Sequence, residues 1–300
     1  MTRALSHPAF RFAPSPNGYL HLGHAFSALE NERLARASGG RLFLRIEDID
    51  KDRCRPEYER AIIEELRWLG IPFDPEIRRQ SHHLADYAQA LVRLERKGIL
   101  YPCFCSRSDI VQRVREKPDW PRDPDGSPLY PGICRHMSRE QRQKRLAAGD
   151  TPAYRIDIER ATALVGGGVS WLDYGSGSEG RLVTADPRKW GDTILARRDI
   201  GTSYHIAVVV DDASQGITDI VRGEDLFHAT SLHRLLQSLL DLPGPVYHHH
   251  ALLRDGAGQK LSKSLRAKSL RSLREEGLTP EMVRTRLVPA PSMVTELQNV

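Results

Sequence analysis

The beginning of the chain alternates between short apolar segments and longer periodic ones, and this alternation restricts the fold more than any other feature. Phe10 to Ala13 is a short apolar-rich run that ends in the turn-forming residues 14–18, and a helical period follows from His21 to about Ala37. Arg41 to Ile46 alternates like a strand, and Pro56 suits the first turn of a helix that reaches Leu69. Strands joined by helices pair in parallel. The sequence therefore predicts an α/β fold with a doubly wound, nucleotide-binding sheet, whose ligands lie beyond the carboxyl ends of the strands.

The later residues predict an insertion and a second half of the sheet. A helix is expected from His83 to Lys97, and the texture then becomes irregular from Tyr101 to Arg135, without an obvious core of its own. The segments expected beyond it are strands at Ala153 to Ile158, around Leu182 to Val183, at Tyr204 to Val210 and at Ile217 to Val221, and a helix from Phe227 to Leu240.

Composition restricts the compartment and the partners. Four cysteines are too few for a disulfide framework in 300 residues, and three of them cluster at positions 103, 105 and 134, which indicates a metal in a reducing compartment. The net charge of +5 favours phosphate-bearing partners without identifying one. Because no run of about 18 apolar residues and no secretory leader is found, we expect a cytoplasmic chain that does not bind a membrane.

Two motifs carry chemistry that phosphate requires. His21-Leu-Gly23-His24 lies where the first strand leads into a helix, so backbone N–H groups and two imidazoles face one polyanion, and Gly23 leaves room for a base or ribose. Lys260-Leu-Ser262-Lys263-Ser264 follows a glycine-bearing segment and offers compact ammonium charges for a transferring phosphate. Each motif alone favours an ordinary interpretation, namely surface or core histidines for the first and a basic loop for the second. Their occurrence together, in this order and at opposite ends of the sheet, favours a phosphate site.

These two motifs resemble the HIGH and KMSKS signatures of class I aminoacyl-tRNA synthetases. Four further segments are similar to glutamyl-tRNA synthetase, and they begin at Arg11, Leu44, Val208 and Val221. The similarity covers roughly residues 9 to 276. It implies a Rossmann-type catalytic domain that binds ATP through His21, Gly23, His24, Lys260, Ser262 and Lys263, with His21, His24 and Lys263 as the catalytic residues.

A substrate with two carboxylates needs two cationic partners and an acceptor for its ammonium group. Arg11 and Arg222 are the candidate cations for glutamate, and the assignment of each to one carboxylate stays open. The resemblance implies that Ser15 and Tyr204 add hydrogen bonds and that Glu47 receives the α-ammonium group. For each of these residues the alternative is a structural salt bridge or hydrogen bond.

The length after the second motif narrows the resemblance. Only 36 residues follow Ser264 (300 minus 264), too few for the helical anticodon-binding region of glutamyl-tRNA synthetases. We therefore expect the truncated paralogue family, the glutamyl-Q tRNA(Asp) synthetases. The parts expected on this basis are residues 1–100 and 191–250 as the two halves of the catalytic domain, 101–190 as an inserted zinc-binding and acceptor-like subdomain, and 251–300 as the loop with a short helical segment.

The resemblance implies an enzyme that works in two steps. Glutamate and ATP, with Mg²⁺, form an adenylate without tRNA, and the glutamate is then transferred to the queuosine base at the wobble position of tRNA(Asp). The expected oligomeric state is a monomer. Two alternatives stay open: a truncated glutamyl-tRNA synthetase that charges tRNA(Glu), and a non-catalytic paralogue that binds nucleotide or RNA.

The resemblance also implies one structural zinc ion. Cys103, Cys105 and Cys134 offer three thiolates, and Tyr130 stands four residues before Cys134, as in the family pattern C-x-C…Y-x3-C. His136 is a rival for the fourth ligand. No chelating role is expected for His248-His249-His250, because it follows a strand-like segment and leads into the second motif.

Overall fold

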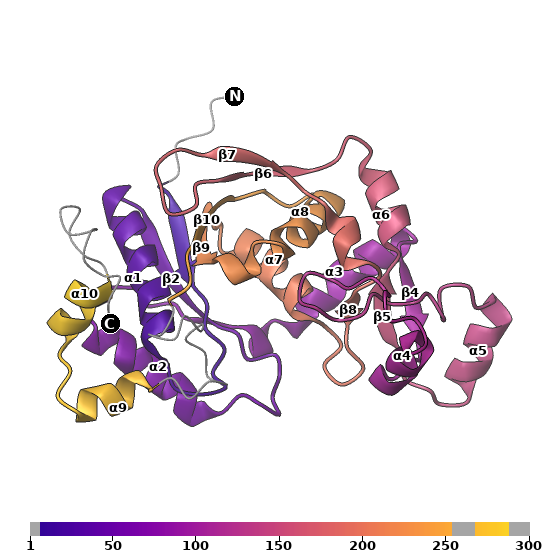
Figure 1. Ribbon diagram of the computed structural model, residues 1–300, viewed down its shortest axis with the longest axis horizontal. Coiled ribbons are helices and arrows are strands. Elements are labelled where there is room, and N and C mark those ends of the chain that lie inside the picture. Colours follow the sequence, from indigo (N-terminus) through magenta and orange to yellow (C-terminus); the bar gives the residue numbers. More distant parts are fainter. Residues whose placement is uncertain (1–6, 254–267, 288–300) are drawn as a thin grey trace.

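The main sheet is built from two groups of parallel strands that meet side by side (Figure 1). The computed structural model describes residues 7–253 and 268–287. One group is β1 (Ala9–Phe12), β2 (Arg41–Ile46) and β3 (Arg78–Arg79), and the other is β9 (Asp219–Gly223), β10 (Val246–His250) and β6 (Ser170–Asp173), with β7 (Arg181–Thr184) antiparallel at the edge. The Thr218 N–H donates to the Ala9 carbonyl oxygen at 3.0 Å, which places β9 beside β1. The chain reverses its winding direction between these two strands, and such a switch point is where doubly wound sheets bind ligands.

Helices cover both faces of this sheet, as the predicted α/β class requires. The helices around it are α1 (Leu22–Ala37), α2 (Pro56–Trp68), α3 (Leu84–Arg96), α7 (Tyr204–Ser214), α8 (Ala229–Leu239), α9 (Leu270–Glu275) and α10 (Pro280–Leu287). Strand β2 shows the two faces: Leu42, Leu44 and Ile46 join the core formed with α1 and α2, whereas Arg45 bonds Asp212 of α7. No helix in the described parts of the chain is long and apolar enough to cross a membrane.

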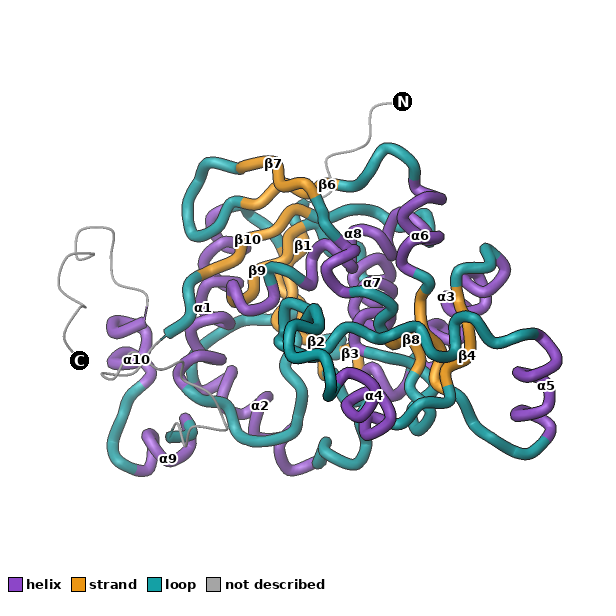
Figure 2. Tube along the Cα trace, turned by 45° about the vertical axis from the view of Figure 1, so that its right-hand side comes forward, coloured by secondary structure: helices purple, strands orange, loops and turns teal. Residues whose placement is uncertain are grey.

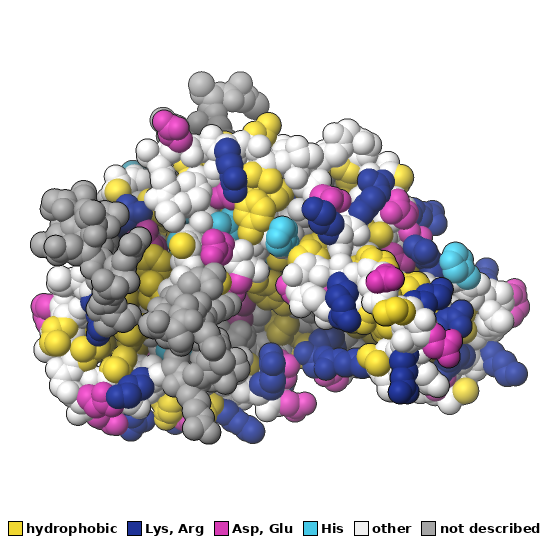
Figure 3. Space-filling model, in the orientation of Figure 1, with side chains coloured by type: hydrophobic (Ala, Val, Ile, Leu, Met, Phe, Trp, Pro, Cys, Tyr) yellow, Lys and Arg dark blue, Asp and Glu magenta, His cyan; other side chains and the backbone are white. Residues whose placement is uncertain are grey.

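A smaller antiparallel sheet forms one end of the elongated molecule (Figure 2). Its strands are β4 (Leu100–Cys103), β5 (Ala153–Ile156) and β8 (Ile194–Ala196), and the helices nearby are α4 (Arg107–Val114), α5 (Arg139–Ala147) and α6 (Ile158–Val165). A space-filling view shows basic and acidic side chains interspersed over this end (Figure 3). The region has a small core of Tyr101, Cys103, Phe104 and Cys134, which the irregular texture of residues 101–135 did not predict.

The insertion expected over residues 101–190 is divided between the two sheets. Strands β6 and β7 form a hairpin, and β6 pairs with β10 of the main sheet, where Tyr247 lies opposite Asp173. Trp171 of β6 packs on Tyr247 and Phe227. A hairpin within the expected insertion therefore completes the main sheet, and sequence order alone did not indicate this pairing.

The prediction of a strand from Tyr204 to Val210 is wrong. These residues begin α7, which continues to Ser214. A short, continuous apolar run suits a buried strand or a buried helix equally well, because both are surrounded by apolar neighbours. In this chain α7 packs with α3 and α8, and Ile206, Ala207, Val208 and Val209 are all buried in the core that they share.

Candidate active site

A cavity of about 560 Å³ opens beyond the carboxyl ends of β1, β2 and β9. Every described residue predicted for ATP or glutamate lines it: Arg11, Ser15, His21, Gly23, His24, Glu47, Tyr204 and Arg222. Apolar walls such as Phe26, Leu226 and Leu252 complete it. Residues from distant parts of the sequence thus meet at the switch point of the sheet.

The predicted Lys260, Ser262 and Lys263 lie outside the described residues. The chain on both sides of them borders the cavity. Leu252 and Leu253 line it, and Ser269 forms a β-bridge with His21. The described residues that flank the second motif therefore lie beside the cavity and the first motif.

The first motif forms the amino end of α1. His21 is the N-cap residue, and the Gly23 N–H donates to its Nδ1 at 3.1 Å. The His21 N–H donates to Nδ1 of His24 at 3.2 Å, and the two rings lie 3.8 Å apart. A ring nitrogen that accepts a hydrogen bond carries no proton, so each neutral ring has its proton on Nε2. The pair can therefore donate from two Nε2–H groups at a helix terminus that already favours anions.

A row of alternating charges holds Arg11 at the floor of the cavity. The Nε of Arg11 donates to Oδ1 of Asp212 at 3.1 Å, and one terminal nitrogen contacts the Val221 carbonyl oxygen at 3.4 Å. The same Asp212 oxygen accepts from Arg45 at 2.7 Å. The Nε of Arg45 in turn lies 3.6 Å from Oε1 of Glu47. The bond to Asp212 orients Arg11 through Nε and leaves its fork-shaped end near the cavity, where a carboxylate can bind.

Glu47 is held in a partly neutral state by its surroundings. Burial raises the pKa of its carboxyl to about 7, although Arg45 and Arg11 favour the ionised form. Its side chain is only 10% exposed. Ionising this buried carboxyl group costs free energy while the cavity holds no substrate. A bound ammonium group offsets that cost, so the position suits an amine.

Arg222 has a different set of partners. The residue is 5% exposed, and its guanidinium bonds His249, His233 and Thr230, all of which are uncharged acceptors. Within the part of the chain that the structure describes, no carboxylate oxygen lies within 4.0 Å of it. Burying a cation without a counter-ion costs free energy, and an anion that binds beside it removes much of that cost.

Tyr204 is the first residue of α7 and Ser15 lies in the loop after β1, and both border the cavity. Burial raises the pKa of the Tyr204 hydroxyl, so it is a neutral donor and acceptor. The sequence did not single out the residues behind the site, namely Arg45, Asp173, Asp212, Thr230 and His233. The sequence signal for these residues was the acidic pair Asp211 and Asp212, which directly follows an apolar run. Carboxylates beside a buried segment need cationic partners, so the pair could have indicated a buried ion-pair network.

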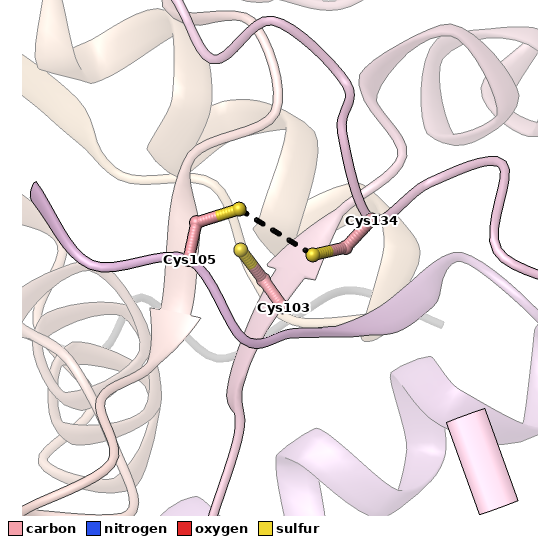
Figure 4. Close-up of side chains that lie close together, drawn as sticks. All are labelled: Cys103, Cys105 and Cys134. Atoms are coloured by element: carbon pink, nitrogen blue, oxygen red, sulfur yellow. Dashed lines mark hydrogen bonds between the residues drawn. The ribbon is translucent and has the colours of Figure 1, made fainter. Parts of the chain in front are cut away.

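The three clustered cysteines point toward one another at one end of the small sheet (Figure 4). Their sulfur atoms all lie within 4.8 Å of one another, and no histidine joins this group among the residues that the structure covers. The sulfur of Cys105 is 3.5 Å from that of Cys134 and 3.4 Å from the Tyr130 hydroxyl. Around a tetrahedral zinc ion, adjacent sulfur ligands are ~3.8 Å apart and sulfur and oxygen ligands ~3.5 Å apart. These residues therefore fit a zinc site, and Tyr130 is placed for the fourth ligand while His136 is exposed.

The surroundings of the cluster favour one thiolate, that of Cys134, whereas the hydrogen bond with Cys134 and burial raise the pKa of the Cys103 thiol to about 12. Hydrogen bonds from the side chains of Cys103 and Tyr130, and from the Phe104 N–H, lower the pKa of the Cys134 thiol to about 6. The Nε of Arg155 donates to the Cys103 sulfur at 3.2 Å, and its guanidinium lies 3.9 Å from the centre of the Tyr130 ring. Zinc binds deprotonated sulfur, so a cation beside the cluster supports the metal-binding form.

Comparison with known proteins defines the class of this fold and site. Residues 9–298 match the family model described as tRNA synthetases class I (E and Q), catalytic domain. A relative named glutamyl-Q tRNA(Asp) synthetase in Rhodobacter capsulatus is 47% identical, and the match covers 91% of this chain and 97% of that protein. A relative of the same name in Symbiobacterium thermophilum is 38% identical, over 91% of this chain and 83% of that protein. The chain belongs to the glutamyl-Q tRNA(Asp) synthetase family, which is a family of ligases. The family expected from the motifs is thereby confirmed.

Longer proteins share the same catalytic architecture. The glutamate-tRNA synthetase of Elizabethkingia anophelis superposes with a TM-score of 0.77 at 25% identity, and the match covers 94% of this chain. This chain spans 61% of the length of that solved structure. Glutamate–tRNA ligase 2 of Nitrosococcus oceani is 38% identical, and this chain spans 56% of it.

Proposed function

We propose that this chain uses ATP to activate glutamate, without tRNA, and transfers the glutamyl group to the queuosine base at the wobble position of tRNA(Asp). One observation carries the glutamate assignment: a single cavity gathers two buried arginines and a buried carboxyl group beside the paired histidines of a helix terminus. The names of the relatives that match over nearly their whole length support the acceptor.

In the first step a glutamate carboxylate oxygen attacks the α-phosphorus of ATP. A bond forms between that oxygen and phosphorus, and the bond to the pyrophosphate oxygen breaks, so pyrophosphate leaves with the electron pair. The Nε2–H groups of His21 and His24 donate to the phosphate as negative charge spreads over it. We assign Lys260, Ser262 and Lys263 to the same phosphates, with Lys263 stabilising the pentavalent phosphorus, and Mg²⁺ accompanies the nucleotide.

The glutamate side of the cavity sets the orientation of the nucleophile. Arg11 and Arg222 bind the two carboxylates, and ionised Glu47 accepts the α-ammonium group. Ser15 and Tyr204 add hydrogen bonds. Fixing both ends of a flexible substrate supplies much of the rate enhancement, because the reacting oxygen is held near the phosphorus before the reaction begins. In the second step a hydroxyl group of the queuosine cyclopentene ring attacks the glutamyl carbonyl carbon, and AMP leaves.

We propose that Cys103, Cys105, Tyr130 and Cys134 hold one zinc ion. Four protein ligands close the coordination sphere, so the ion would supply rigidity to the small sheet and no open position for chemistry. The distances within the cluster and the cation Arg155 behind it support this assignment.

Pyrophosphate exchange tests the activation step. We expect exchange of label into ATP with glutamate, and much weaker exchange with glutamine or aspartate, with or without tRNA. Exchange that requires tRNA contradicts tRNA-independent activation. Absence of any glutamate-dependent exchange supports a non-catalytic paralogue instead.

Transfer of labelled glutamate tests the acceptor. The expected product is an ester that forms with queuosine-modified tRNA(Asp) and not with the same tRNA lacking the modification. Transfer to unmodified tRNA(Glu) supports a truncated glutamyl-tRNA synthetase, the second candidate, which the 38% identity to a glutamate–tRNA ligase keeps in view.

A further inference from the structure

Behind Arg222 lies a shell of polar side chains that the proposed reaction does not use. Each of the three guanidinium nitrogens has one short contact: Nε with Nε2 of His249 at 3.2 Å, one terminal nitrogen with Nδ1 of His233 at 3.4 Å, and the other with Oγ1 of Thr230 at 2.6 Å. His233 is 2% exposed and Thr230 is fully buried. Arg222 is thus held in one orientation by three different acceptors from β10 and α8.

The alternation of strand β10 explains why only one histidine of the His248 to His250 run belongs to this shell. His249 points toward Arg222, while His248 has its Nε2 3.1 Å from Oδ1 of Asp219 and stacks on Tyr174. His250 contacts the Ala251 carbonyl oxygen and the Phe26 ring. The three consecutive imidazoles therefore have three different environments and share no ligand.

Proton positions in this shell follow from the donors that face it. Arginine only donates, so His249 accepts at Nε2 and carries its proton on Nδ1, which lies 3.0 Å from Oδ2 of Asp173. His233 accepts at Nδ1, so its Nε2 proton points to Nδ1 of His205 at 3.2 Å. Burial, and next the charge of Arg222, lower the pKa of His233, and burial also lowers the pKa of His249 although its bond to Asp173 opposes this. Both imidazoles in contact with Arg222 are thus neutral.

We infer that Arg222 faces the side-chain carboxylate of glutamate, and that His233, His249 and Thr230 are positioning residues that fix it. Because these partners are uncharged and no described carboxylate contacts Arg222, the substrate's side-chain carboxylate is its counter-ion and glutamate is selected over glutamine. This inference deepens the proposed function and rests on it. Asp173 does not touch Arg222. It accepts a hydrogen bond from His249 and so fixes the tautomer of that ring, as carboxylates behind metal-ligating histidines do.

The reason lies in the cost of burying charge. If Arg222 were oriented by an aspartate or glutamate, the internal ion pair would already satisfy its charge, and a substrate carboxylate would have to compete with it. Neutral acceptors give the same directional hydrogen bonds without that competition. A neutral amide such as that of glutamine then leaves the buried cation without a counter-ion, which is the usual origin of strong discrimination by buried polar groups.

An isosteric pair of variants separates charge from shape. In His233→Asn the amide oxygen replaces Nδ1 as a neutral acceptor, whereas His233→Asp places a carboxylate at the same point. We expect the KM for glutamate in pyrophosphate exchange to rise less than about threefold in the first variant and at least about tenfold in the second, with kcat changing less. The ratio of kcat/KM for glutamate over glutamine should fall at least about tenfold in His233→Asp alone.

The matched control is the same pair at the neighbouring strand position that faces away from Arg222. His248→Asn and His248→Asp should share one KM for glutamate. Melting curves of all four variants report folding. If the His233 variants do not fold, His249→Gln and His249→Glu repeat the comparison, because a glutamine oxygen replaces Nε2.

The outcomes are distinct. If the unaltered chain exchanges pyrophosphate with glutamate and the neutral and charged variants have the same KM and the same glutamate preference, this inference is overturned and the proposed function stands. If the unaltered chain shows no such exchange, both fall. A selective loss of glutamate affinity in the charged variant supports the inference.

Discussion

At the scale of single residues, Glu47 contributes to the proposed site only when its carboxyl group is ionised. It lies at the end of β2 with Arg45 beside it, and both side chains are enclosed by α7 and the sheet. Burial dominates over the favourable charges, so the carboxyl group titrates near neutral pH. The affinity for an amino acid therefore depends on pH in the range where most enzymes are assayed.

We predict that the KM for glutamate falls roughly tenfold between pH 6 and pH 8, because the ionised fraction of a group with a pKa of about 7 rises by about that factor. Glu47→Gln should have a higher KM that no longer depends on pH in this range. The measurement is pyrophosphate exchange at a series of glutamate concentrations and pH values.

A second buried carboxyl group provides the control for this pH dependence. Burial also raises the pKa of Glu65 to about 7. Glu65→Gln should keep the pH dependence of KM, since Glu65 does not line the cavity. If Glu47→Gln retains the wild-type dependence, the ammonium-binding role of Glu47 is wrong.

The fourth zinc ligand is also decided by a single residue. We predict one zinc per chain after dialysis, and at least about tenfold weaker zinc binding in Tyr130→Phe than in the unaltered chain. The reason is that the Tyr130 hydroxyl lies 3.4 Å from the Cys105 sulfur, whereas His136 is exposed and outside the cluster. Competition with a chromophoric chelator measures the affinity. His136→Ala is the control, and zinc loss in that variant alone would reverse the assignment.

At the scale of elements, the sequence predicted helices and strands well where a period was repeated several times. Strand β2 has the predicted bounds, and α1, α2, α3 and α8 each begin and end within two residues of the expected positions. The error at Tyr204 has a physical cause: a seven-residue, mostly apolar run is compatible with either period when it is surrounded by core residues. Only the position of α7 between α3 and α8 decides the outcome.

The side chain of Glu65 on α2 contributes to the contact between α2, α9 and the residues that precede α1. The Leu20 N–H donates to Oε2 of Glu65 at 3.3 Å, and the Leu270 N–H donates to the Leu20 carbonyl oxygen at 2.7 Å. Oε1 of Glu65 is buried and makes no hydrogen bond of normal geometry in the described structure, although the Arg271 N–H also favours the ionised carboxyl group. Ionising Glu65 in this position is therefore unfavourable.

We predict that Glu65→Gln is more stable than the unaltered chain at pH 8, by roughly 1 to 3 kcal/mol, and that this advantage disappears at pH 4.5 to 5. A raised pKa in the folded chain contributes stability that is fully present below about 4.5, the carboxyl's ordinary value, and is lost as the pH rises through about 7. Glutamine removes the charge and keeps the acceptor for Leu20.

Unfolding in urea at the two pH values measures this effect. The neighbouring variant Glu64→Gln is the control, because Glu64 is 71% exposed and pairs with Arg274 at the surface. Equal stability of Glu65→Gln and the unaltered chain at pH 8 would show that the buried carboxyl group imposes no cost.

At the scale of the whole molecule, the candidate site is a junction between segments that are far apart in the sequence. Arg11 and Asp212 are 201 positions apart and share a buried ion pair. The β6–β7 hairpin, which lies within the expected insertion, supplies Asp173 to the shell of Arg222. The small sheet with the cysteine cluster lies at one end of the molecule and α9 and α10 at the other (Figure 1).

The described residues on either side of the predicted second motif lie beside this junction. We predict that Lys263→Ala lowers kcat of glutamate-dependent pyrophosphate exchange by at least about 100-fold and changes the KM for glutamate little, because its charge is needed in the transition state. Lys268→Ala is the control, since Lys268 is an exposed partner of Glu276. Equal exchange rates in Lys263→Ala and the unaltered chain would refute the assigned role.

The sequence by itself determined the β1–α1–β2–α2 unit and the helix terminus with its two histidines, and it predicted charged residues for a dicarboxylate substrate. These are local properties, since periodicity, turn residues and residue type act over a few positions. Only the tertiary structure decided that residues 204–210 form a helix, that Tyr130 and not His136 approaches the cysteines, and that neutral imidazoles hold Arg222. The physical reason is that buried charges and hydrogen bonds are satisfied by partners from distant segments, and the packing of the sheet determines which partners are within reach.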